Sequence, residues 1–197
     1  MWNEIENLLK ATRFAIRLEL RPTDRNLAEF DYIQAKQPSY FPTVIGAASV
    51  AFESVFSPEE QMIMICRRHG GKRVHIRKKD FCFKQIQFDP NVSIHFRKRK
   101  EGDRGYWIRE ALVTGLCRKI INYRNLFLGI AHADFGMVPT IRHANFFVSV
   151  ERGLVFFMYD DRGLLIASPS QEDLPELPSS LNILKREDLR GTEFLNR

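Results

Sequence analysis

The stretch FFMYDDRGLLIA, residues Phe156 to Ala167, decides the fold expected for this chain. Two apolar runs flank its charged centre, Asp160-Asp161-Arg162-Gly163. Asp is favoured at the first position of a type I turn and Gly at the fourth, so the centre predicts a tight turn between two strands. Both faces of the run 154–159 are apolar, which is typical of a central strand that is covered on both sides.

A further strand is expected before this pair. Residues 145–150 have strand composition, and Glu151-Arg152-Gly153 forms a short turn that leads into 154–159. Three consecutive strands joined by short turns make an antiparallel meander. The sequence therefore predicts an α+β fold: a mixed or antiparallel sheet with a C-terminal β-meander, packed by several helices.

The rest of the chain is assigned from apolar periodicity and from turn signals. Pro38 and Pro42 indicate an extended link, and 98–105 a charged loop. Strands are predicted at 14–20, 61–66, 74–77, 81–88 and 92–97, and helices at 2–10, 27–36, 43–56, 106–117, 123–132 and 172–177.

Length and composition favour one domain. The chain has 197 residues, 44% of them hydrophobic, which is enough for a core without disulfides. We expect a single α+β domain over 1–197, with 66–105 as a basic β-rich insertion and 168–197 as a C-terminal tail. No run approaches the ~20 apolar residues of a membrane span, and the first residues lack the order of a secretory signal. A cytoplasmic protein with three reduced cysteines is expected.

Positive charge is concentrated in one region. Residues 66–100 hold twelve Lys and Arg against two Asp, a net charge of +10, whereas the whole chain carries +6. Such a surface suits either nucleic-acid phosphates or a protein partner with an acidic face. The predicted partner-binding residues are Arg73, Arg77, Lys78, Lys79, Lys84, Arg97, Lys98 and Arg99.

Two adjacent carboxylates, Asp160 and Asp161, also invite a catalytic interpretation, with His132 as an acid or base. Turn chemistry explains them without catalysis, because nothing in the local sequence completes a catalytic set. A pairing of His132 and Asp134 with His143 lacks a nucleophile, so a polar helix end is preferred. We predict no catalytic residue.

The pattern Cys66-x2-His69-x5-His75-x6-Cys82 contains ligand types that zinc uses. Its spacing matches none of the closed structural zinc patterns, and both cysteines lie in apolar runs, where a thiol behaves as a small hydrophobe. No metal and no cofactor are predicted.

The segment Tyr159-Asp160-Asp161-Arg162-Gly163 resembles the hallmark of an uncharacterised bacterial domain family of unknown function. Asp134-Phe135-Gly136 after Tyr123-Arg124 is similar to that family's helix ending, and Arg17-Leu18-Glu19-Leu20 to its first strand. The chain departs from the family at Leu165, where Asp is common, and 66–105 has no counterpart that we can place. The family's resemblance to proteins found beside polymorphic toxins implies an immunity role by association.

We therefore expect a non-enzymatic binding protein of immunity type, which neutralises a toxin domain through an acidic surface of that toxin. One alternative is a nucleic-acid-associated protein that uses the basic strands in 72–100. A second alternative is an uncharacterised enzyme centred on Asp160 and Asp161.

Overall fold

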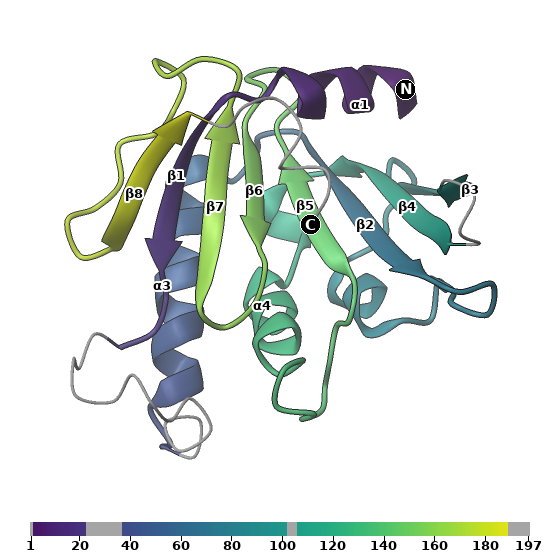
Figure 1. The fold of residues 1–197 in the computed structure, drawn as a ribbon, viewed down its shortest axis with the longest axis horizontal. Coiled ribbons are helices and arrows are strands. Elements are labelled where there is room, and N and C mark those ends of the chain that lie inside the picture. Colours follow the sequence, from purple (N-terminus) through teal and green to yellow (C-terminus); the bar gives the residue numbers. More distant parts are fainter. Residues whose placement is uncertain (1, 23–36, 102–105, 189–197) are drawn as a thin grey trace.

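The computed structural model describes residues 2–22, 37–101 and 106–188, and these residues form an eight-stranded antiparallel sheet with helices on its faces (Figure 1). The strands run in the order β3-β4-β2-β5-β6-β7-β1-β8. Its helices are α1 (Trp2–Ala11), α3 (Tyr40–Val55) and α4 (Tyr123–Ala131), with 3₁₀ turns η1 (Phe81–Gln85) and η2 (Arg118–Ile120). Its strands are β1 (Phe14–Glu19), β2 (Met62–Gly70), β3 (Ser93–Glu101), β4 (Tyr106–Leu116), β5 (Ala144–Val148), β6 (Val155–Met158), β7 (Gly163–Ser168) and β8 (Asn182–Asp188).

The predicted meander is confirmed as β5-β6-β7. Strand β6 pairs with β5 on one side and with β7 on the other, and all four of its residues are buried. The first strand of the chain, β1, lies beside β7, with Phe14 opposite Ser168 and Glu19 opposite Gly163. Gly163, which ends the turn 160–163, therefore lies opposite the end of β1, and β7 pairs the N-terminal strand with the meander.

Helices cover both faces of the sheet, so each face has its own core. On one face, α3 and α4 lie against the strands, and Phe52 contacts five aromatic rings. On the other face, Ile5 and Leu9 of α1 pack against alternate residues of the same strands, such as Phe146 and Phe157. Coverage of both faces explains why β6 has no polar side.

The helix predicted at 106–117 is wrong, because this segment is strand β4. Six consecutive residues, 108–113, are buried, so the alternation that identifies a strand is absent. Arg109 and Glu110 are charged and yet lie 6% and 1% exposed. Their partners come from distant parts of the chain, which a local pattern does not reveal.

Two predicted strands before β3 are also wrong. Residues 74–77 form a loop, and 81–88 contain η1 followed by a single bridge between Ile86 and Ile121. The imperfect alternation at 81–88 reflects this turn, since Cys82 and Phe83 are both buried. The third predicted strand is confirmed as β3, which continues to Glu101 and replaces the first part of the expected loop.

The C-terminal part differs from prediction in one element. Residues 172–177 are turns and irregular chain rather than a helix, interrupted by Pro175. Strand β8 was not predicted, and it pairs antiparallel with β1 at the edge of the sheet. The helix expected at 27–36 and the loop at 102–105 lie outside the described residues. Among the described helices, none has the length and apolarity to span a membrane.

Candidate functional site

The predicted cations lie on three elements. Arg73, Arg77, Lys78 and Lys79 are exposed on the loop 72–79, and Lys84 is exposed on η1. Arg97, Lys98 and Arg99 lie on β3, the edge strand of the sheet.

One buried arginine holds the loop against the sheet. Arg109 of β4 donates from Nε to the carbonyl oxygen of Val74 at 3.1 Å and from a terminal nitrogen to that of Lys72 at 3.0 Å. Its other terminal nitrogen is buried and has no hydrogen-bond partner among the described residues. The loop cations are thereby brought beside β3 and β4.

Alternation along β3 separates its cations onto two faces. Arg97 and Arg99 point to the α1 face, where Arg97 binds Glu110 and Glu6, both at 2.6 Å, and lies 4.0 Å from the centre of a Trp2 ring. Arg99 donates to Glu110 at 3.3 Å. Two of the eight predicted partner-binding residues are therefore held by intramolecular ion pairs.

Glu110 is the centre of a buried ionic network. Its carboxylate and the Arg67 guanidinium meet at 2.8 Å, with side chains 0% and 2% exposed. Burial by itself would raise the pKa of Glu110, but the charge of Arg67 and the hydrogen bonds from Arg97 and Arg67 outweigh it and lower that pKa. Glu110 is therefore ionised at neutral pH, and its role is structural.

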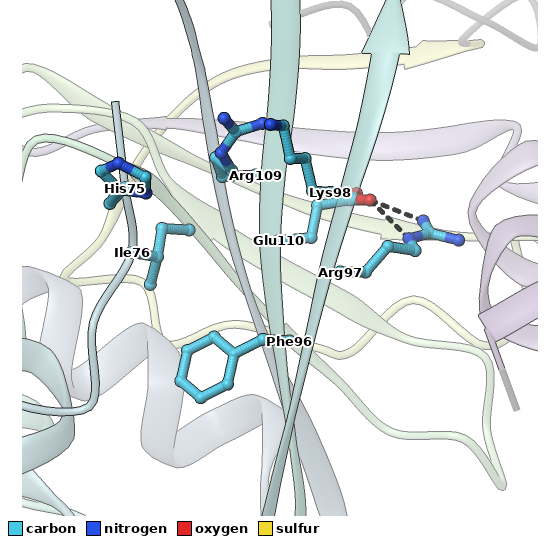
Figure 2. Close-up of a pocket in the computed structure, with 7 residues that line it drawn as sticks. All are labelled: His75, Ile76, Phe96, Arg97, Lys98, Arg109 and Glu110. Atoms are coloured by element: carbon cyan, nitrogen blue, oxygen red, sulfur yellow. Dashed lines mark hydrogen bonds and ion pairs between the residues drawn. The ribbon is translucent and has the colours of Figure 1, made fainter. Parts of the chain in front are cut away.

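On the other face of β3, Lys98 borders a pocket of about 270 Å³ (Figure 2). Figure 2 shows His75 and Ile76 of the loop and Phe96 of β3 around it, with Arg97 turned away to Glu110. Lys98 Nζ lies 3.9 Å from the centre of the Trp107 ring. Desolvation and the nearby charges of Arg109 and Lys72 lower the pKa of Lys98. Arg109 and Lys72 are thus the positive charges that act on Lys98 beside this pocket.

We call the exposed cations of the loop 72–79, together with Lys98 and Lys100 of β3, the basic surface; Lys98 lines the pocket itself. Two aromatic side chains beside it are exposed, Phe96 by 50% and Tyr106 by 56%. Within the described residues, no carboxylate forms an ion pair with the cations of the basic surface. Its residues are Lys72, Arg73, Arg77, Lys78 and Lys79 of the loop and Lys98 and Lys100 of β3.

The signature turn is held by hydrogen bonds within the protein. Asp160 accepts from the backbone N–H of Arg162 at 2.8 Å and forms an ion pair with the Arg162 guanidinium. Asp161, which is 2% exposed, accepts a hydrogen bond from the Tyr40 hydroxyl. The Arg162 carbonyl accepts from Leu20 N–H at 2.9 Å. Asp161 thus connects the turn to α3, the Arg162 carbonyl connects it to Leu20 directly after β1, and Asp160 bonds within the turn.

Burial raises the pKa of Asp161, and the negative charges of Asp160 and Asp134 add to this effect. The hydrogen bond from Tyr40 opposes the rise. His132 contributes its Nδ1 to a hydrogen bond with the Pro139 carbonyl oxygen at 3.1 Å, and its ring lies 4.7 Å from that of Phe41. Its polar contact is thus with the backbone and not with the turn.

Tyr40 and Phe41 were not identified from sequence. The extended link expected at Pro38 to Pro42 is instead the start of α3, where Pro42 is tolerated because first-turn N–H groups have no helical partner. Tyr40 and Phe41 bring the Asp-Phe-Gly segment and the signature turn together, since both rings contact Phe135.

The predicted zinc-type pattern is not assembled as a unit. Cys66 and Cys82 approach each other, but among the described residues their third neighbour is His143 and not His69 or His75. A hydrogen bond from Cys66 lowers the pKa of Cys82 to about 6, with help from His143 and against the effect of burial. Burial raises the pKa of Cys66. All three cysteines are unpaired.

The fold and these sites define an α+β protein that has an eight-stranded antiparallel sheet and a buried acidic turn beside α3. The profile of one family, Domain of unknown function (DUF3885), matches residues 1–182, and the chain belongs to this family. The matched range includes 66–105. Searches of curated proteins and of solved structures found no match.

Proposed function

We propose that this chain is a non-enzymatic binding protein that docks an acidic protein partner on its basic surface. The observation that carries the proposal is the set of exposed cations on the edge strand β3 and on the loop 72–79, whose backbone is bound by Arg109 of the adjacent strand β4. Such a surface attracts an oppositely charged partner and raises the rate of association.

The neighbouring side chains favour a protein partner over a nucleic acid. The rings of Trp107 and Phe88 already lie against the ammonium groups of Lys98 and Lys78, so these faces are occupied rather than open to stack bases. Exposed Phe96 and Tyr106 add the aromatic area that protein interfaces use. Strand β3 pairs with β4 alone among the described strands, so its outer edge offers backbone groups to a partner strand.

The narrower form of the proposal is an immunity protein that acts in the cytoplasm and covers the active site of a bacterial toxin domain. The resemblance of the family's proteins to those found beside polymorphic toxins supports this form by association. In this proposal Asp160 and Asp161 have a structural role, since Asp160 binds Arg162 within the turn and Asp161 connects the turn to Tyr40.

The test is co-purification of the tagged protein with the product of the adjacent gene, together with protection of cells that express that product. Charge reversal by Arg77→Glu, Lys78→Glu and Lys98→Glu should abolish both. A control reversal at two exposed cations elsewhere, Lys10→Glu and Arg124→Glu, should leave both unchanged, and it is compared with the double variant Arg77→Glu and Lys98→Glu. If the first variant binds and protects as the unaltered protein does, the proposal fails.

The same variants also test the competing hypothesis, that the basic surface binds nucleic acid. Such binding would appear as binding of RNA or DNA oligonucleotides at low salt that weakens steeply with added salt and is lost in the charge-reversal variant. Tight oligonucleotide binding of this kind, without any protein partner, would replace the proposed function.

A further inference from the structure

Three side chains of types that bind metals converge from different parts of the chain. They are Cys66 in β2, Cys82 in η1 and His143, which directly precedes β5. Their ligand atoms all lie within 4.8 Å of one another. The elements that carry two of them are paired in the sheet, because Cys66 is opposite Asn145 in the β2–β5 ladder.

The distances suit one small metal ion. Cys82 Sγ and His143 Nε2 are 3.4 Å apart. Zinc binds sulfur at ≈2.3 Å and nitrogen at ≈2.0–2.1 Å, so a tetrahedral site separates the two ligand atoms by about 3.5 Å. The observed separation fits that geometry with little adjustment.

A buried amide supports this arrangement. Asn145 accepts a hydrogen bond from Cys66 Sγ at 3.3 Å and donates from Nδ2 to the His143 carbonyl oxygen at 2.8 Å. One side chain, itself 1% exposed, thus positions two of the three ligand residues. The contact with Cys66 uses the thiol proton that zinc binding displaces, so Asn145 positions this sulfur before the ion binds.

Access is available on the side of the imidazole. A second pocket, of about 310 Å³, is lined by His143 and Asp80. Both sulfurs are buried, so an ion or a water molecule can reach the group more readily than an organic substrate can. Asp80 also acts electrostatically on both thiols, and it adds a carboxylate near the site.

We propose that Cys66, Cys82 and His143 form a zinc-binding site whose fourth ligand is a water molecule at this pocket. Two sulfurs and one imidazole are a donor set that zinc favours, whereas magnesium and calcium prefer oxygen. A bound ion would join η1 to strands β2 and β5. The proposed zinc site is independent of the partner-binding role proposed for the basic surface.

The test is metal binding by the full chain, reduced and stripped with a chelator, then titrated with Zn²⁺ in competition with a chromogenic chelator. We expect one equivalent per chain. Cys82→Ser and His143→Gln should each weaken zinc binding by more than about 100-fold. Loss of a residue that only supports a ligand weakens metal binding by about 10–100-fold, so a larger loss identifies a ligand. The matched controls Cys117→Ser and His75→Gln should bind as the unaltered protein does.

A second measurement needs no substitution. Co²⁺ added to the unaltered chain should give the intense visible bands and the thiolate charge-transfer absorption of a four-coordinate sulfur site. The absence of these bands and of stoichiometric zinc uptake overturns the proposal, as does loss of binding in either control. A Cys66–Cys82 disulfide formed under peroxide in a protein that takes up no zinc after reduction would assign the thiols to redox chemistry instead.

Discussion

Glu110→Gln should destabilise the protein strongly, because it removes the carboxylate that forms a buried ion pair with Arg67. Breaking a buried ion pair by changing one partner costs about 3–5 kcal/mol, since the remaining charge stays buried. Arg97 and Arg99 are more exposed and contribute about 0–1 kcal/mol each. We expect a loss of about 3–4 kcal/mol in the free energy of unfolding.

The measurement is urea unfolding followed by tryptophan fluorescence, since Trp2 lies against Arg97 on the same network. For a chain of this size the expected loss corresponds to a fall in melting temperature of about 6–16 °C. Glu59→Gln is the matched control, because Glu59 is 70% exposed and its ion pair with Lys119 is at the surface. It should change the stability by less than about 1 kcal/mol.

A double variant distinguishes the loss of stability caused by an unpaired buried charge from the loss caused by poorer packing. Arg67→Met with Glu110→Leu removes both charges and keeps apolar volume, so its stability should lie well above that of Glu110→Gln. A loss below about 1 kcal/mol in Glu110→Gln would refute the reasoning. So would a double variant that is no more stable than the single one.

The same carboxylate predicts an acid dependence. The pKa of Glu110 is lower in the folded protein than its ordinary value, so its stabilising contribution is complete above the unfolded pKa of about 4.3. It is lost as the pH falls through the lower folded value. The stability difference between the unaltered protein and Glu110→Gln should therefore shrink below about pH 4.

Three further substitutions test the core and the turn by the same unfolding assay. Tyr40→Phe removes the hydrogen bond from the Tyr40 hydroxyl to the buried Asp161 carboxylate and should cost about 1–3 kcal/mol. The loss should grow as the pH rises, because this hydrogen bond stabilises the charged form of Asp161, whose pKa is already raised by burial; a loss independent of pH contradicts this. Gly163→Ala places a Cβ 2.6 Å from a backbone carbonyl oxygen and should cost about 1–3 kcal/mol. Gly46→Ala is the control: its Cβ meets open space in α3, so it should stabilise the protein by about 0.5–1 kcal/mol. Equal effects of the two substitutions would show that the turn tolerates a side chain. Phe52→Ala should cost about 3–5 kcal/mol, and a value under 1 would mean that this ring is not central to the core.

Elements with a complete local signal were predictable. The meander combines apolar strands with a turn whose Asp and Gly suit type I geometry, and β5, β6 and β7 lie where that pattern places them. The helices α1, α3 and α4 and strand β2 follow from apolar periodicity for the same reason. The concentration of positive charge in 66–100 is likewise a property of the sequence itself.

Contacts between distant residues decided the rest. The local pattern of β4 predicts a helix, but the segment is a strand that pairs with β2 and β3. Arg67 and the backbone of the loop 72–79 satisfy its buried charges. The tertiary structure, and not the sequence spacing, places His143 rather than His69 or His75 next to Cys82. His143 is 61 positions from Cys82 in the chain. Tyr40 meets Asp161 across 121 positions. A buried polar group needs a partner, but sequence pattern carries no information on which distant residue supplies it, so only the tertiary structure determined these sites.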